Sequence, residues 1–124
     1  MENNTNRTYL KKKKSWESDL FIRLDALMKE EQLYLDSKLT RKELAIRLGT
    51  NECYLVASIH KACDGQTFSE YINSHRLDYA YKRLQEERMY SVEKISLESG
   101  FASRTTFYRL FKKRFGTTPT KIPE

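Results

Sequence analysis

The residues best suited to chemistry lie between Ser99 and Gly116, in the stretch SGFASRTTFYRLFKKRFG. Ser103 is a good helix N-cap residue, and Phe107 and Phe111 follow at the spacing of one helical face. At about 100° per residue, the opposite face carries hydrogen-bonding and cationic groups. Such groups bind phosphates and the acceptor atoms of base edges, so this face is suited to an anionic polymer. Its members are Thr105, Tyr108, Arg109 and Lys112, with Arg104, Thr106 and Lys113 beside them.

A short helix and a tight turn precede this predicted helix. Val92, Ile95 and Leu97 are spaced for the short helix. Residues 99–102, which include Gly100, form a brief turn before the cap. A short helix, a tight turn and a cationic second helix are the layout of a helix-turn-helix, which places its second helix in the major groove of DNA.

The same layout occurs a second time, earlier in the chain. Leu44 and Leu48 belong to a short helix that ends near Gly49, and Asn51 is the N-cap of the helix that follows. The cap and the apolar positions of the two second helices are 52 residues apart. A repeat of this length in a short chain indicates two related modules rather than a solenoid. The matched pairs are Asn51 with Ser103, Leu55 with Phe107, and Ile59 with Phe111.

The charge of the chain is basic and unevenly distributed. The 124 residues are enough for one domain or two subdomains, and they include 23 Lys and Arg against 17 Asp and Glu. Residues 101–124 contain six basic residues and a single acid, Glu124. Such an excess indicates a nucleic acid or an acidic surface as the partner. With only four glycines and two prolines in the chain, long helices can run uninterrupted.

Several function classes are disfavoured by what the sequence lacks. Cys53 and Cys63 are ten residues apart on one predicted helix, about 15 Å at 1.5 Å per residue, so they cannot pair with each other. No zinc-ligand spacing, histidine dyad or glycine-rich phosphate loop is present, and we expect no metal, no cofactor and no enzyme. The sequence contains no membrane-spanning apolar run and no signal-peptide core, which favours the cytoplasm.

The chain divides into a flexible basic lead-in (1–17), an N-terminal helix with the first helix-turn-helix (18–65), a connecting helix (66–88), and the second helix-turn-helix with a C-terminal tail (89–124). The Lys11–Lys14 run of the lead-in either adds affinity for DNA or anionic lipid or is a solvated linker, which its composition favours. The N-terminal helix is predicted over Asp19–Gln32, with its apolar stripe at Leu20, Leu24, Leu27 and Met28.

The connecting helix is long enough to act as a strut. About 18 residues at 1.5 Å each span about 27 Å, close to the roughly 34 Å of one turn of B-DNA. We therefore expect it to hold two reading helices at that spacing on one face of a duplex.

The first module begins at a capping box made by Thr40 and Glu43.

A specific combination of motifs runs from about Leu39 to Ile122. It consists of LA at 44–45 with LG at 48–49, the apolar pattern of the connecting helix around RL at 76–77, and above all SGF at 99–101, FYRLFK at 107–112, FG at 115–116 and TP at 118–119. On these motifs the chain resembles the DNA-binding domain of AraC/XylS-type bacterial transcription regulators. The resemblance implies an all-α fold of about seven helices with two helix-turn-helix subdomains joined by a long helix. The second helices, at about 51–63 and 103–115, would enter successive major grooves.

The resemblance also implies which residues contact DNA. In this family the base-reading positions fall early in the second helix of each module. The matching residues are Arg104, Thr105, Thr106 and Arg109 in one module, and Glu52, Cys53, Val56 and Ala57 in the other. Tyr108 and His60 add polar groups to these faces. For phosphate contacts we expect Lys112, Lys113, Arg41, Lys42 and Lys61, with ordinary solvated surface as the alternative interpretation of each lysine.

The two predicted faces are chemically unequal. Arginine can bind guanine bidentately, whereas the small apolar groups of Cys53, Val56 and Ala57 can contact thymine methyls but cannot hydrogen-bond to base edges. We therefore expect the second module to read sequence, and the first to read mainly shape, methyl groups and phosphates.

These observations predict a sequence-specific regulator of transcription that binds double-stranded DNA. The alternative is a non-catalytic helical adapter that docks an acidic protein or RNA through its N-terminal helix and basic tail. No effector pocket is recognisable in the sequence, so we expect the chain to be the DNA-binding part of a larger sensor protein. RNA polymerase and an N-terminal sensor domain are then candidate partners in addition to DNA.

Overall fold

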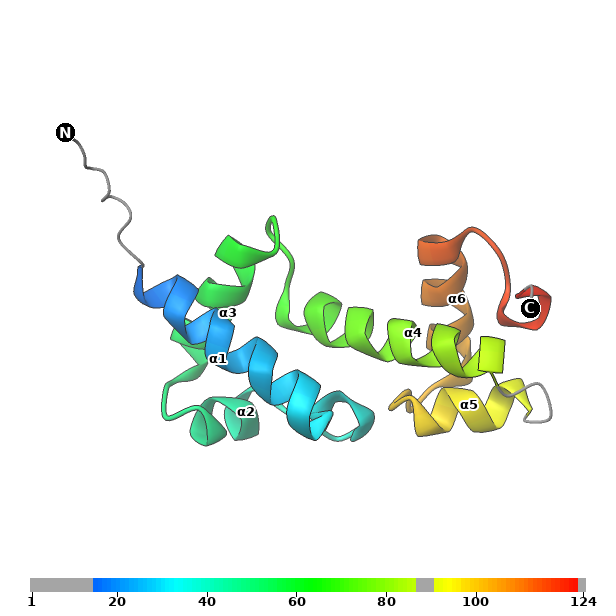
Figure 1. The fold of residues 1–124 in the computed structure, drawn as a ribbon, viewed down its shortest axis with the longest axis horizontal. Coiled ribbons are helices and arrows are strands. Elements are labelled where there is room, and N and C mark those ends of the chain that lie inside the picture. The colour runs from blue at the N-terminus through cyan, green and yellow to red at the C-terminus, as the bar shows by residue number, and fades with distance from the viewer. Residues whose placement is uncertain (1–14, 87–90, 123–124) are drawn as a thin grey trace. The chain divides into compact units, whose positions relative to one another are not determined.

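The computed structural model describes residues 15–86 and 91–122, and every regular element within them is a helix (Figure 1). The prediction of an all-α fold is confirmed. Six α-helices and two short 3-10 helices in these residues come close to the predicted seven. They are α1 (Trp16–Glu31), η1 (Leu33–Leu35), α2 (Arg41–Arg47), α3 (Glu52–Ala62), α4 (Phe68–Glu86), α5 (Val92–Glu98), α6 (Arg104–Phe115) and η2 (Pro119–Lys121).

Side-chain caps start the helices of both modules. Asn51 Oδ1 accepts a hydrogen bond from the Tyr54 backbone amide at 2.8 Å, and Ser103 Oγ accepts one from the Thr106 amide at 3.2 Å. These bonds satisfy amide groups that the first turn of a helix leaves without a partner. The capping box predicted at the start of α2 is also formed, by Thr40 and Glu43. The starts of α3 and α6 are therefore where the sequence predicts them.

The N-terminal helix differs from its prediction at both ends. It begins at Trp16, three residues before Asp19, because Ser15 Oγ accepts a hydrogen bond from the Ser18 amide at 3.2 Å. It ends before Gln32, whose φ of 49° is left-handed and cannot continue a right-handed helix. The chain continues as the short 3-10 helix η1, in which Tyr34 is buried. Residues 1–14 of the predicted lead-in and residues 87–88 of the predicted connecting helix lie outside the described residues.

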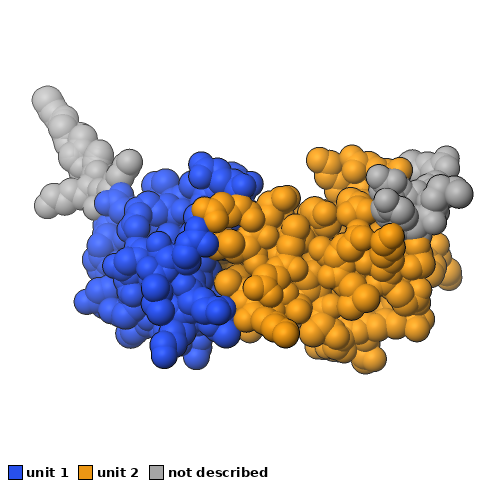
Figure 2. Space-filling model, turned by 90° about the horizontal axis from the view of Figure 1, so that it is seen from below, with its two compact units in different colours: residues 1–30, 40–68 blue, residues 31–39, 69–124 orange. Residues whose placement is uncertain are grey.

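The described chain forms two compact units, coloured separately in Figure 2. Unit 1 contains the described residues of 1–30 and 40–68, and unit 2 contains those of 31–39 and 69–124. Residues 31–39, which start at the last residue of α1, belong to unit 2 by their contacts. Each unit holds one helix-turn-helix, α2 with α3 in unit 1 and α5 with α6 in unit 2.

The core of unit 1 is aliphatic. The predicted stripe of α1 is buried at Leu20, Leu24 and Met28, which expose 6% or less of their surface. Leu44 of α2 and Leu55 and Ile59 of α3 are each fully buried and complete this core. Arg23 ties α1 to the end of α2, since its Nη2 donates to the Leu48 carbonyl oxygen at 2.6 Å. Burial of this apolar surface fixes which side of α3 remains exposed.

The core of unit 2 is aromatic. Phe107 and Phe111 of α6 are fully buried with ring centroids 5.5 Å apart, and they pack with Phe101 from the turn before the helix. Leu77 and Ala80 of α4 and Ile95 of α5 close the cluster. Because α6 buries its phenylalanine side in this cluster, its opposite, cationic side is turned outward.

The turn between α5 and α6 is tightly packed against η1. Gly100 has a φ of 97°, a conformation that residues with a Cβ rarely adopt. A Cβ at this position would lie 2.3 Å from the Tyr34 carbonyl oxygen and 2.8 Å from Arg76 Nε. The same Nε donates to that carbonyl oxygen at 2.6 Å, and Arg76 Nη2 donates to the Asp36 carbonyl oxygen at 2.9 Å. Arg76 of α4 therefore holds the 31–39 segment against the turn that precedes α6.

Candidate nucleic-acid interface

The outward face of α6 carries cations and hydroxyls of the predicted kind. Its first turn contains no acid, and its last turn contains Lys112, Lys113 and Arg114. Five of the seven residues predicted to contact DNA through this helix are exposed, and two are partly buried. The exposed ones are Arg104, Thr105, Arg109, Lys112 and Lys113, and the partly buried ones are Thr106 and Tyr108.

Tyr108 is partly buried and has a packing role. Its ring meets the Phe107 ring edge-on, with centroids 5.8 Å apart and an interplanar angle of 87°. The guanidinium carbon of Arg104 lies 5.3 Å from the centre of the Tyr108 ring, within cation–π range. The tyrosine thus links the core of unit 2 to the arginine at the start of α6.

Arg104 is held from a second direction by an acid that the sequence analysis did not single out. Its Nη2 lies 3.0 Å from Oε2 of Glu93, in the first turn of α5. Both side chains are largely exposed, at 65% for Arg104 and 49% for Glu93. The sequence places Glu93 two residues after the α5 cap, Ser91, where an acid is common, but nothing local indicates that it pairs with Arg104.

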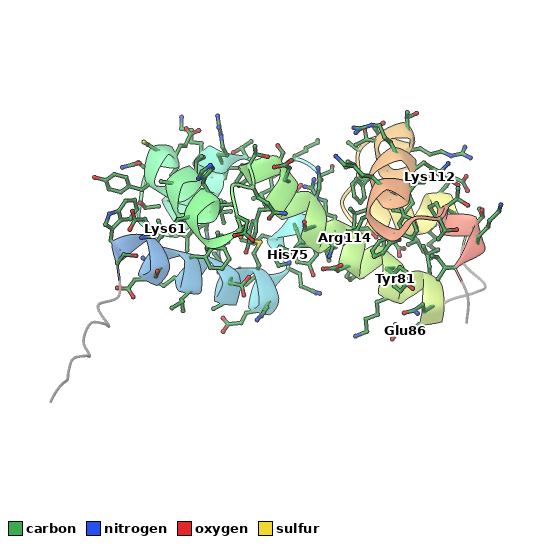
Figure 3. All side chains as sticks on the ribbon, turned by 90° about the horizontal axis from the view of Figure 1, so that it is seen from above. Lys61, His75, Tyr81, Glu86, Lys112 and Arg114 are labelled. Atoms are coloured by element: carbon green, nitrogen blue, oxygen red, sulfur yellow. The ribbon has the colours of Figure 1, made fainter. Side chains whose placement is uncertain are left out.

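Arg114 and Lys112 lie on different sides of the same helix. Arg114 Nη2 donates to Asp78 Oδ1 of α4 at 2.7 Å, so this guanidinium ties α6 to the connecting helix. In Figure 3 Arg114 lies on the side of α6 toward α4, and Lys112 lies on the other side. The cationic face available to a partner is therefore the one that carries Arg109 and Lys112.

The outward face of α3 is much less basic. Cys53 and His60 are exposed, and Val56 and Ala57 are partly buried. Glu52, predicted as a base contact, is exposed and lies 3.4 Å from Arg41 Nε, predicted as a phosphate contact. The carboxylate and the guanidinium of these two residues are thus already paired across the first helix-turn-helix.

The start of α1 packs beside α3, which the sequence analysis missed. The Trp16 and Tyr54 rings have centroids 4.7 Å apart, although both residues remain about half exposed. Lys61 Nζ, predicted to contact phosphate, lies 3.6 Å from Glu17 Oε1 and 3.4 Å from Ser15 Oγ. A lone tryptophan at the end of a polar stretch was the available signal. The last predicted phosphate contact, Lys42, is exposed on α2.

The two cysteine thiols are free and differ in environment. Cys53 is exposed on α3, whereas Cys63, which caps the end of α3, is partly buried. Burial, with the nearby carboxylates of Asp25 and Asp64, raises the pKa of the Cys63 thiol. Among residues 15–86 and 91–122, no group of three or more His, Cys, Asp or Glu side chains could hold a metal ion. Nor does any helix of this described part have the length and apolar character needed to cross a membrane.

Proteins with similar sequence include transcription regulators. A family model described as a helix-turn-helix domain matches residues 44–123. The probable transcription factor PqrA of Proteus vulgaris is 40% identical over 97 residues, covering 73% of this chain and 78% of PqrA. The uncharacterised HTH-type transcriptional regulator YtdP of Bacillus subtilis strain 168 is 40% identical over 84 residues, covering 68% of this chain but 11% of YtdP.

A solved structure shares the fold. It is the C-terminal domain of the two-component response regulator yesN from Fusobacterium nucleatum, with a TM-score of 0.71 and 24% identity. The match covers 86% of this chain and all of that domain.

Proposed function

The chain belongs to the AraC/XylS-type family of helix-turn-helix transcription regulators, and on that premise we propose that α3 and α6 enter successive major grooves of one DNA duplex. The observation that carries this proposal is the outward face of α6, where exposed Arg104 and Arg109 stand among hydroxyls without an acid on the same helix face. Charges of mixed sign would keep an exposed helix equally soluble, whereas a uniformly positive face attracts a polyanion such as DNA.

Within this proposal, α6 supplies the sequence reading. Arg109 is exposed one turn inside the helix, and a guanidinium there can donate two parallel hydrogen bonds to guanine O6 and N7. Thr105 and Thr106 add hydroxyls at the start of the helix. Lys112 and Lys113, one turn further on, are exposed and suited to phosphates.

In the same proposal α3 reads mainly shape and methyl groups. The small apolar side chains of this face can contact thymine methyl groups but cannot form hydrogen bonds to base edges. They are Cys53, Val56 and Ala57. Because Glu52 is engaged by Arg41 at 3.4 Å, a base contact from this carboxylate requires the pair to loosen. Phosphate contacts from Arg41 and Lys61 compete in the same way with their present partners.

We further propose that the chain acts as the DNA-binding part of a larger sensor protein and meets RNA polymerase at its promoter. Support comes from YtdP, of which the matched segment is only 11%, and from the yesN fragment, which is the C-terminal domain of a two-component response regulator. The first part is tested by the gene sequence, which should encode a sensor domain in the same reading frame upstream of this segment. Transcription with purified RNA polymerase from a bound promoter, with and without the protein, tests the second.

The decisive experiment is a selection of duplexes from a random pool. A reading regulator enriches a defined sequence, and we expect stronger base preference in the half bound by α6 than in the half bound by α3. Titration with double-stranded and single-stranded DNA at several salt concentrations follows, and the slope of log affinity on log salt should imply several phosphates at about 0.9 per contact. An adapter would bind weakly and without regard to strandedness, and that result would end the proposal.

Replacing Arg109 and Lys112 separately by alanine should distinguish their roles. Arg109→Ala is expected to weaken binding to the selected duplex by about 1–3 kcal/mol. Binding to random duplex should be nearly unchanged, because base contacts account for the discrimination. Lys112→Ala is expected to weaken both duplexes alike and to lower the salt slope by about one contact. Fluorescence anisotropy with labelled duplexes measures both. Equal losses for the two variants on both duplexes would contradict the assignment.

The native thiols provide a test of the role given to α3. Without DNA, Cys53 should react with iodoacetamide faster than Cys63, because burial and nearby acids raise the pKa of Cys63 and reduce its thiolate fraction. Saturating duplex should slow alkylation of Cys53 several-fold and leave Cys63 as the internal control. Mass spectrometry of the two peptides measures both rates. Unaltered alkylation of Cys53 in a saturated complex would exclude α3 from the interface.

A further inference from the structure

The arginine that begins α6 is constrained by a carboxylate from a different helix. Arg104 Nη2 lies 3.0 Å from Glu93 Oε2 of α5, and the Arg104 guanidinium lies 5.3 Å from the centre of the Tyr108 ring. One contact comes from across the helix-turn-helix and the other from one turn further along α6. Together they restrict a side chain that would otherwise sample many rotamers.

The position of Arg104 makes this carboxylate more than an ordinary surface charge. Arg104 is the first residue of α6, at the positive end of the helix dipole, where acids are favourable and cations are not. The first turn of α6 contains no acid of its own. Glu93 therefore supplies, from α5, the negative charge that the start of α6 lacks.

A guanidinium held in this way differs from a free cation in what it binds well. The guanidinium has five N–H donors in one plane, so some of them can remain bonded to Glu93 while the others donate hydrogen bonds to a base. Phosphates carry negative charge and have no single required direction, and a carboxylate 3.0 Å from the guanidinium repels them. The pair thus favours an oriented contact to a base over a general contact to the backbone of DNA.

The structure assigns to Glu93 a role as a specificity-determining, positioning residue: by holding Arg104 it orients that side chain for base reading and weakens its attraction to phosphates. This assignment rests on the proposed function, because it requires α6 to meet duplex DNA. It goes beyond that proposal by giving an acidic residue outside the reading helix control over the ratio of specific to non-specific binding.

The first helix-turn-helix shows the reverse arrangement and makes the assignment specific to α6. There the reading helix α3 contributes the acid, Glu52, and the supporting helix α2 contributes Arg41, with 3.4 Å between Oε1 and Nε. Loss of that acid would free a cation on α2, not on the helix proposed to read bases. In the described residues, Glu93 with Arg104 is therefore the pair that links a supporting acid to a base-reading arginine.

The test compares Glu93→Gln with the unaltered chain on the selected duplex and on random duplex. Random-duplex affinity should rise about two- to fivefold, the strength of an exposed ion pair, and its salt slope should steepen by about 0.9. Selected-duplex affinity should not rise, so the ratio of selected to random affinity should fall by at least about two- to fivefold. Glu93→Asp keeps the charge but shortens the reach, and it should lower the ratio without raising random-duplex affinity.

Two controls isolate the mechanism. Glu86→Gln removes an exposed acid from the end of α4, on the opposite side of unit 2 from Lys112 in Figure 3, and should leave the ratio unchanged. In an Arg104→Gln background, Glu93→Gln should no longer alter the ratio, because the residue acts through that arginine. Thermal unfolding should be nearly the same for all variants, since exposed ion pairs contribute little to stability.

The possible results separate this inference from the function it rests on. If the unaltered chain does not prefer any duplex, both fail. Suppose instead that the unaltered chain discriminates well, but Glu93→Gln raises the affinity for both duplexes by the same factor, or changes the ratio equally in the Arg104→Gln background. Glu93 is then only a surface charge, and this inference alone is wrong.

Discussion

Gly100→Ala is expected to lower the free energy of unfolding by about 2–5 kcal/mol, combining about 1–2 for a left-handed backbone with 1–3 for overpacking. The φ of 97° already disfavours any residue with a Cβ. The added methyl would also lie 2.3 Å from the Tyr34 carbonyl oxygen and 3.1 Å from the Leu35 Cα, and backbone atoms cannot rotate away as a flexible side chain can. The turn must open, and α6 shifts with it.

Gly116→Ala is the matched control for this substitution. Gly116 has a φ of 75° and caps the end of α6, but no atom lies within 4 Å of its added Cβ. Gly116→Ala should therefore lower the free energy of unfolding by only about 1–2 kcal/mol, the cost of a left-handed backbone conformation. Urea denaturation followed by circular dichroism measures both variants. Equal losses would mean that the approach of Gly100 to Tyr34 contributes nothing, and that only the positive φ matters.

The elements that the sequence predicted well are those specified by local patterns. Asn51 and Ser103 could be placed as caps because a cap bonds to an amide three residues away, and the α1 stripe follows from helical periodicity alone. The start of α1 was misplaced because Ser15 and Trp16 stand in a stretch of charged residues, where no periodicity announces a helix. Its position depends partly on the Trp16 ring meeting Tyr54, a contact distant in sequence.

What the sequence did not predict depends on contacts between residues that belong to different structural elements. The motif at 76–77 contributed to the family resemblance, but nothing local indicated that Arg76 would bind carbonyl groups of residues 34 and 36. Likewise the exposed face of α6 follows from the helical wheel, whereas the Glu93–Arg104 pair depends on how α5 and α6 cross. The base and phosphate contacts remain predictions, since they depend on a partner as well as on the fold.

Arg76→Met is expected to cost about 2–4 kcal/mol of stability, because charge-assisted hydrogen bonds contribute roughly 1.5–3 kcal/mol each and are partly screened here by solvent. Burial lowers the pKa of the Arg76 guanidinium, with the nearby Asp36 opposing that effect, so the structure tolerates a partly desolvated charge at this point. It does so because the guanidinium joins η1 to α4 through two carbonyl oxygens. Methionine retains much of the length of the side chain but none of the donors.

The Arg76 and Gly100 predictions concern one junction and should therefore be non-additive. Both residues meet the Tyr34 carbonyl, Arg76 by donating to it and Gly100 by leaving room for it. Once either is replaced, part of the contact is already lost, so the double variant should be less destabilised than the sum of the two losses. Arg109→Met, at an exposed arginine of α6, should change stability by no more than about 0.5 kcal/mol. Strict additivity in urea denaturation would show that the guanidinium and the glycine support α6 through separate contacts.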